Sequence, residues 1–200
     1  MRRIFLIWTA LLVAVLLHAQ NATSVLDKSA ATLRAAGNVK IGFTLEVDGG
    51  ASAGYIKLQR QKFVVNVGGS ITWFDGKTMW TYVKANEEVN VTIPTAAEVA
   101  KMNPYAFLTF YKKGYTAKMG SSTAKEHEVV LTGSEKTPYK KVVVRINKVS
   151  NMPSSIRMTS TKDAVTTIRC NSLLKNQKYK ESTFRFNQKN YPNVEVVDLR

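Results

Sequence analysis

The feature that most constrains the fold of this chain is an alternation of apolar and polar side chains with a period of two. The first such stretch places Ile41, Phe43, Leu45 and Val47 on one side of an extended backbone. Successive side chains of a β-strand point to opposite faces, so one face is apolar and the other is wet. The pattern therefore predicts half-buried β-strands rather than helices.

Short turn sequences separate the alternating stretches. Gly49-Gly50-Ala51-Ser52 and Gly68-Gly69 each turn the chain, and Asp75-Gly76 is a strong hairpin signal. Strands connected by such short turns pair as an antiparallel meander. The further alternating stretches are 56–59, 63–67, 71–74, 78–83 and 89–93, and then 129–131, 142–146, 156–158, 165–170, 184–186 and 194–196.

Two regions carry helical signals instead. Leu26, Ala30 and Leu33 recur at helical spacing after Ser24, and Gly37 ends that run. The second region lies between Pro94 and Gly114.

That second region begins with Thr95 and Glu98, which form a capping box. Asn103 and Pro104 then predict the start of another helix, in which aromatic and aliphatic side chains crowd together before Gly114. A helix that is apolar nearly all round is expected to be buried or to cover an apolar surface.

These elements predict a mainly β fold with some α-helix. The simplest assembly is a strongly curved antiparallel sheet with helices against its concave face. The 200 residues suit a single domain with a real core, and 44% apolar with 22% charged residues excludes wholesale disorder. Two His and one Cys leave no room for a zinc cluster, a disulfide framework or a redox pair, so no metal and no cofactor are expected.

The first 20 residues resemble an export signal. Arg2 and Arg3 precede an apolar run from Ile4 to Leu17, and Leu17-His18-Ala19 offers a cleavage site. The alternative is an uncleaved anchor, although the run is short for a membrane span. We expect a signal peptide over residues 1–20, one domain over residues 21–200, and a soluble, exported protein. Since no Cys lies near the cleavage site, the chain is not expected to be a lipoprotein itself.

The formal net charge is +15, and most of the excess lies in the second half of the chain. Nucleic acid is excluded as a partner because export removes the chain from it and no recognition motif accompanies the charge. A solvated basic face, or docking to anionic lipid headgroups or to an acidic partner, remain as alternatives.

Catalytic constellations are mostly missing. His127 lies in a polar run, and Cys170 alternates with Ile168 as a small core residue would. Gly76-Lys77-Thr78 lacks the upstream glycine and the following helix of a phosphate-binding loop. We therefore expect no enzymatic activity.

Several motifs resemble, in order, those of the LolA-like outer-membrane lipoprotein carriers. The central one is Phe74-Asp75-Gly76-Lys77-Thr78-Met79-Trp80-Thr81-Tyr82, preceded by Gly54-Tyr55-Ile56-Lys57-Leu58-Gln59-Arg60. Asn103-Pro104-Tyr105-Ala106-Phe107-Leu108 is similar to the lid helix of the family. Phe184-Arg185-Phe186-Asn187 and Tyr191-Pro192-Asn193-Val194-Glu195-Val196-Val197-Asp198 are similar to its C-terminal motif.

The resemblance implies an unclosed β-barrel covered by a helical lid, which carries lipoprotein acyl chains across the periplasm as a chaperone. Its implied partners are acylated lipoproteins or lipids, an inner-membrane lipoprotein-releasing transporter and an outer-membrane acceptor, with the carrier acting as a monomer. The strand arginine that latches the lid in this family falls on Arg60, where Gln61 replaces the usual proline. The alternative for Arg60 is an ordinary exposed arginine.

An acyl chain in water costs about 0.8 kcal/mol per CH₂, so a carrier needs a comparable apolar lining. The alternative for each lining candidate is ordinary core, which apolar strand residues more often form than a cavity wall. The candidates are Phe43, Leu45, Ile56, Leu58, Phe63, Val65, Trp80, Val91, Ile93, Val99, Met102, Phe107 and Leu108.

Three functional hypotheses follow. The first is a periplasmic carrier that shuttles lipoproteins from the inner to the outer membrane. The second is an envelope-stress sensor or a general lipid-binding protein of the same fold. The third is an exported lipid hydrolase. It is disfavoured because the G-x-S-x-G string Gly50-Ala51-Ser52-Ala53-Gly54 is followed by an alternating, strand-like stretch and not by the helix that a nucleophile elbow requires.

Overall fold

The computed structural model describes residues 22–102 and 110–200. The predicted signal peptide lies outside the described residues, as does the greater part of the predicted aromatic helix, residues 103–109. The end of that segment forms a short 3-10 helix, Phe110–Lys112, before Gly114 adopts a positive φ of 79°.

The predicted N-terminal helix is confirmed over residues 22–35. Its apolar stripe is buried, since Leu26, Ala30 and Leu33 are each no more than 4% exposed. Gly37, at a φ of +68°, takes the left-handed conformation that commonly ends helices. Within the described ranges, no helix has the length and apolar character needed to cross a bilayer.

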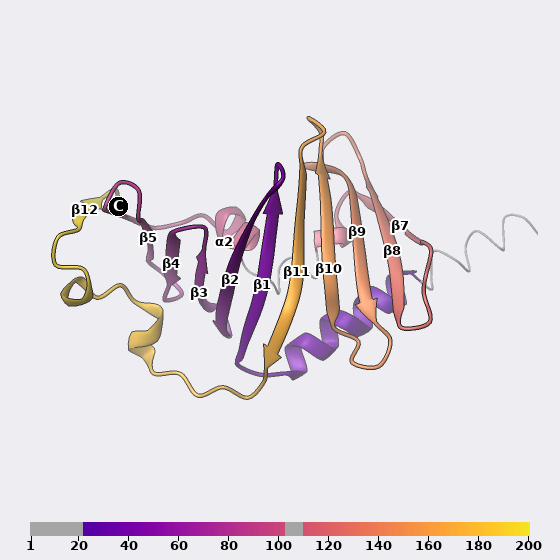
Figure 1. The fold of residues 1–200 in the computed structure, drawn as a ribbon, viewed down its shortest axis with the longest axis horizontal. Coiled ribbons are helices and arrows are strands. Elements are labelled where there is room, and N and C mark those ends of the chain that lie inside the picture. The colour runs from indigo at the N-terminus through magenta and orange to yellow at the C-terminus, as the bar shows by residue number, and fades with distance from the viewer. Residues whose placement is uncertain (1–21, 103–109) are drawn as a thin grey trace, which may run out of the picture. The chain divides into compact units, whose positions relative to one another are not determined.

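Twelve strands dominate the described residues (Figure 1). Their bounds are β1 Val39–Val47, β2 Gly50–Gln59, β3 Lys62–Val67, β4 Ser70–Phe74, β5 Met79–Val83, β6 Glu88–Thr92, β7 Tyr115–Met119, β8 Glu126–Gly133, β9 Tyr139–Asn147, β10 Pro153–Ser160, β11 Val165–Leu174 and β12 Glu195–Asp198. Helix α2, Ala96–Met102, and the 3-10 helices η2, Glu181–Phe184, and η3, Gln188–Asn190, complete the set.

Hydrogen bonding orders the strands as β12-β6-β5-β4-β3-β2-β1-β11-β10-β9-β8-β7. Consecutive strands from β1 to β6 pair antiparallel through short turns, as the alternation predicts. The added C-terminal strand β12 is parallel to β6, which the sequence does not indicate. Since β12 and β7 end the order, the sheet of the described residues is not closed, and the predicted mainly β, unclosed antiparallel fold is confirmed.

The chain divides into two compact units, and β11 contributes to both. The described part of the first unit comprises residues 22–32 and 110–167. Its core consists of alternate positions on β8, β9 and β10, which face one side of the sheet. These buried residues are Val129, Leu131, Val142, Val144, Ile146, Ile156 and Met158. Strand β7 in this unit has no counterpart among the predicted strands.

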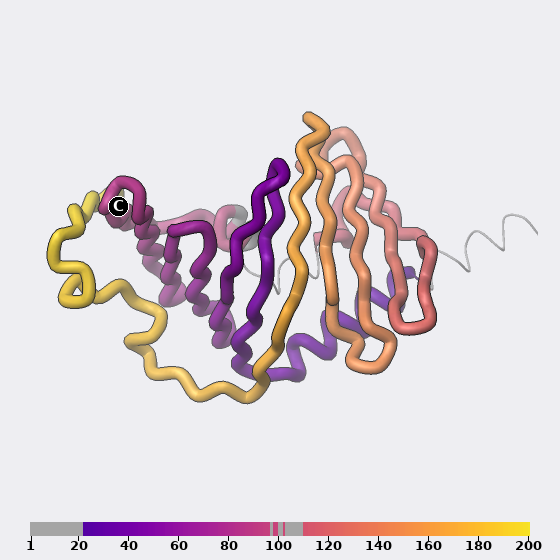
Figure 2. The backbone as a smooth tube through the Cα atoms, viewed as in Figure 1, coloured from indigo at the N-terminus to yellow at the C-terminus, as the bar shows by residue number. Residues whose placement is uncertain are grey.

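The described part of the second unit comprises residues 33–102 and 168–200. Residues 175–194, which we call the C-terminal segment, connect β11 to β12. This segment, gold to yellow in Figure 2, returns along the sheet to β12 beside β6. The strand predicted at 184–186 is wrong. Phe184 is the last residue of the 3-10 helix η2 and is fully buried. Its ring packs on the surface of the sheet, and the segment does not pair as a further strand.

Local signals in the second unit fold as predicted. Asp75-Gly76 turns β4 into β5, with Gly76 at a φ of +100°. The Thr95 amide donates to Glu98 at 2.8 Å and the Glu98 amide donates to the Thr95 hydroxyl at 3.3 Å, which is the reciprocal capping box.

Candidate functional site

The sheet of the second unit has two faces of different character, which the strand register defines. We call one the aliphatic face. Its members point to the same side because they stand opposite one another or two residues apart along a strand. They are Val39, Ile41, Phe43 and Leu45 of β1, Ile56 and Leu58 of β2, Phe63 and Val65 of β3, Phe74 of β4 and Met79 of β5.

Burial along the aliphatic face is graded. Leu58 and Phe63 are fully buried and stand opposite each other, and the Phe63 ring lies 5.2 Å from the Phe74 ring. Toward the other end of β1, Phe43 and Leu45 are only half-buried. One end of this face is therefore closely packed core, whereas the other keeps large apolar side chains partly accessible.

Gly54 helps to make the accessible end. It stands opposite Phe43 on β1, and the Phe43 ring lies close to it. A Cβ at Gly54 would come within 2.8 Å of Phe43 Cζ and 2.6 Å of the Asn66 carbonyl oxygen. The missing side chain is what leaves room for the aromatic ring at this position.

The structure brings six of the predicted lining residues together on the aliphatic face, namely Phe43, Leu45, Ile56, Leu58, Phe63 and Val65. Trp80 and Val91 stand opposite each other on the other face of the sheet. Ile93 follows the end of β6 and is 57% exposed. The alternation of side chains cannot be followed across the β4–β5 turn, so it does not predict which face Trp80 occupies. In the structure Trp73, and not Phe74, shares a face with Trp80.

The remaining lining candidates belong to the second helical region. Val99 and Met102 lie on α2 and are half-buried. Phe107 and Leu108 lie outside the described residues.

Arg60 is exposed and occupies the turn between β2 and β3, at a φ of +54°. Strand β2 ends at Gln59, so the alternation that aligns Arg60 with Ile56 and Leu58 stops one residue before it. Its role as a lid latch stays a prediction.

The opposite side, which we call the aromatic face, is covered by the C-terminal segment. Val64, Trp73 and Phe184 form its buried centre, and Trp80, Tyr82, Phe186 and Tyr191 pack against them. The Trp73 ring meets Phe186 and Tyr191 edge-on at 5.6 and 5.8 Å. The prediction of strands missed this layer, although the close spacing of aromatic residues at 179–191 is a signal for it.

Polar contacts of side chains also fasten the same segment. The Tyr179 hydroxyl donates to the Val39 carbonyl at 3.1 Å, Lys62 pairs with Glu181, and Arg185 pairs with Asp75 at 3.0 Å.

Asp75 connects this segment to the β4–β5 turn, because its carboxylate also accepts from the backbone amides of Lys77 and Thr78. Burial by itself would raise the pKa of Asp75, but these amides and the Arg185 guanidinium outweigh it and hold the pKa below 3.8.

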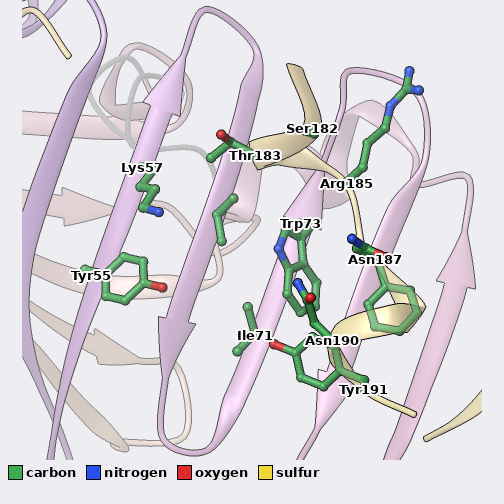
Figure 3. A pocket seen from close by; sticks show the side chains of 12 residues that line it. Tyr55, Lys57, Ile71, Trp73, Ser182, Thr183, Arg185, Asn187, Asn190 and Tyr191 are labelled. Carbon is green, nitrogen blue, oxygen red and sulfur yellow. The ribbon is translucent and has the colours of Figure 1, made fainter. Parts of the chain in front are cut away.

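A groove of about 600 Å³ lies on the aromatic face between β2 and the C-terminal segment (Figure 3). Val64, Ile71 and Trp73 form its floor. Tyr55 and Lys57 stand on one side, and Asn190 and Tyr191 on the other. Sequence reasoning did not find this groove, because its two sides are more than 120 residues apart in the chain.

The two residues weighed as catalytic candidates, Cys170 and His127, lie on strands β11 and β8. Cys170 is half-buried and burial raises the pKa of its thiol, which disfavours the reactive thiolate. His127 stands opposite Ile146 within the β8–β9 pair. Among residues 22–102 and 110–200, no three His, Cys, Asp or Glu side chains gather as a metal site would require.

Comparison with known proteins identifies the family of this chain. The chain matches the family model described as outer membrane lipoprotein carrier protein LolA over residues 12–162. It therefore belongs to this family, and the resemblance seen in the sequence motifs is confirmed. No curated protein matches the chain.

Solved structures are similar in fold at low sequence identity. An uncharacterized conserved protein from Thermus thermophilus has a TM-score of 0.59 at 13% identity, covering 89% of this chain and 99% of that one. A LolA superfamily protein from Nitrosomonas europaea has a TM-score of 0.42 at 11% identity, covering 82% and 97%. The lipoprotein LppX of Mycobacterium tuberculosis has a TM-score of 0.47 at 8% identity, covering 80% and 98%.

Proposed function

We propose that this protein is a non-enzymatic periplasmic carrier that binds the acyl chains of lipoproteins and moves them from the inner to the outer membrane. The observation that carries the proposal is the graded burial of the aliphatic face. Phe43 and Leu45 keep apolar surface partly accessible beside a fully buried base at Leu58 and Phe63.

The energetics fit a carrier that must also release its cargo. Transferring an acyl chain out of water yields about 0.8 kcal/mol per CH₂, so a chain of a dozen or more carbons requires an extended apolar surface. Half-buried Phe43, Leu45 and Val65 offer such a surface without the close packing that would have to be broken for entry.

Membership of the lipoprotein-carrier family supports an exported, lipoprotein-binding role. The proposed partners are an inner-membrane lipoprotein-releasing transporter as donor and an outer-membrane acceptor.

Uptake of a fluorescent fatty-acyl probe tests the binding step. Leu45→Asp places a charge at the accessible end of the aliphatic face, and we expect at least a tenfold loss of probe affinity. Ala53→Asp adds the same charge to the exposed, opposite side of β2 and is the matched control, with unchanged affinity expected. Equal probe binding by both variants and the unmodified protein would show that acyl chains bind elsewhere.

A transfer assay then separates a carrier from a lipid sensor. The protein is loaded with an acylated lipoprotein and mixed with acceptor membranes, and the lipoprotein recovered in those membranes is measured. A carrier delivers its cargo, whereas a sensor of the same fold retains it. Retention with intact probe binding would replace the carrier proposal with the sensor.

A further inference from the structure

The groove on the aromatic face lies on the opposite side of the sheet from the proposed acyl site, so its chemistry is independent of the proposed function. Its base is apolar, since Val64 and Trp73 are only 3% and 9% exposed and Ile71 lies beside them. Its rim is polar. A volume of about 600 Å³ falls within the 300–1,000 Å³ typical of small-molecule sites.

Polar groups converge on this space from both sides. Figure 3 shows the Tyr55 hydroxyl and the Lys57 ammonium directed into the groove from β2, and the side-chain ends of Asn190 and Tyr191 directed into it from the C-terminal segment. The pKa of Tyr191 is raised, first by burial and then by the neighbouring phenols of Tyr55 and Tyr82.

The groove also carries positive charge. Lys57 lines the groove, and Lys40 stands opposite Lys57 on β1, just outside the lining. Both lysines lie over the Tyr55 ring, with their ammonium nitrogens 5.7 Å (Lys57) and 5.0 Å (Lys40) from its centre. Among the residues that the structure describes, neither lysine has an ion-pair partner, and no carboxylate lines the groove.

Three acidic residues of the same unit are already engaged by other cations. Asp75 pairs with Arg185, Glu181 with Lys62, and Glu46 with Arg169. Two cations without partners beside converging hydrogen-bond donors form a site suited to an oxyanion.

A bare anion would leave most of the groove empty, because one water-sized volume is only about 30 Å³. Amide and phenol groups both donate and accept hydrogen bonds, which suits the hydroxyl groups of a ring, and the apolar base suits its C–H surface. We propose that this groove binds an acidic sugar, meaning a pyranose that carries a carboxylate or a phosphate, with the oxyanion on Lys57 and the charge of Lys40 beside it.

Isothermal titration of the mature protein with glucuronate and with glucose 6-phosphate tests the proposal, with glucose and inorganic phosphate as reference probes. We expect both acidic sugars to bind at least tenfold more tightly than either reference. Phosphate binding as tightly as glucose 6-phosphate would overturn the sugar assignment, and glucose binding as tightly would overturn the role of the charge.

Variants locate the binding. Lys40→Gln with Lys57→Gln removes both charges without breaking an ion pair, and we expect at least a tenfold loss of affinity for the acidic sugars. Lys118→Gln, an exposed lysine of β7 in the other unit, is the matched control with unchanged affinity. Thermal unfolding checks that each variant is folded, and a folded double variant that binds normally would overturn the proposal.

Two further measurements separate this site from its alternatives. Vesicles of phosphatidylglycerol test a lipid headgroup as the source of the oxyanion. Vesicle binding that the double variant abolishes, without binding of the soluble sugars, would replace the sugar with the headgroup and overturn the proposal. Uptake of the fatty-acyl probe should be unchanged in the double variant, so failure of this inference and of the carrier proposal are distinguishable.

Discussion

Replacing Asp75 tests how the C-terminal segment is fastened to the sheet. The side chain is only 11% exposed and accepts from the Thr78 amide at 2.9 Å, the Lys77 amide at 3.0 Å and the Arg185 guanidinium at 3.0 Å. A hydrogen bond to a charged group contributes about 1.5–3 kcal/mol, and the exposed Lys77 amide can turn to water instead. Asp75→Ala should therefore lower the free energy of unfolding by about 2–3 kcal/mol.

Thermal and urea unfolding measure this loss. For a chain of this size 1 kcal/mol shifts the Tm by roughly 2–4 °C, so Asp75→Ala should lower the Tm by ~4–12 °C. Asp75→Asn keeps an acceptor for the backbone amides and loses only the charge opposite Arg185, so a smaller loss of about 1 kcal/mol is expected. A Tm within about 1 °C of the unmodified protein for Asp75→Ala, roughly the precision of the scan, would refute this account of the segment.

The pH dependence gives an independent check. Because the pKa of Asp75 is lowered in the folded protein, its stabilisation is complete above the unfolded-state pKa near 4. That stabilisation is lost as the pH falls through the lowered folded-state pKa. The stability difference between the unmodified protein and Asp75→Asn should be largest at neutral pH and shrink below about pH 4. A difference that grows on acidification contradicts the assignment.

Three further substitutions probe other contacts. Gly54→Ala should lower the free energy of unfolding in urea by about 1–3 kcal/mol and weaken acyl-probe binding, because the new Cβ would lie 2.8 Å from Phe43 Cζ. Unchanged probe binding would argue against a role for the Phe43 ring. Phe63→Ala should cost about 3–5 kcal/mol, since the side chain is fully buried, and a loss below about 1 kcal/mol would show that its surroundings collapse onto the gap. Tyr111→Phe removes a 2.7 Å hydrogen bond to Asp27 and should cost about 1 kcal/mol, and no measurable change in the urea midpoint would mean that the bond makes no net contribution.

Local signals predicted the elements whose geometry depends on near neighbours. The Asp75-Gly76 turn and the Thr95–Glu98 capping box form as expected, because each is made by residues within a few positions of one another. The alternation on β1, β2 and β3 correctly gathers Phe43, Ile56 and Phe63 on one face, since strands joined by short turns inherit their register from the turn.

The alternation of apolar residues did not predict the positions that depend on long-range contacts. Phe184 and Phe186 alternate as strand residues would, yet they pack on the sheet surface, since burying a ring against Trp73 is an alternative to pairing at an edge. Trp80 and Val91 resemble lining residues in sequence, but the phase of the alternation across the β4–β5 turn places them on the aromatic face.

For this protein the sequence alone determined the mainly β class, the hairpin order and the membership of the carrier family, because apolar periodicity and short motifs are local properties. Tertiary structure alone decided which face each aromatic residue occupies and that a charged groove exists. The groove depends on β2 meeting a segment more than 120 residues away, a contact set by the packing of Phe184, Phe186 and Tyr191 on the sheet.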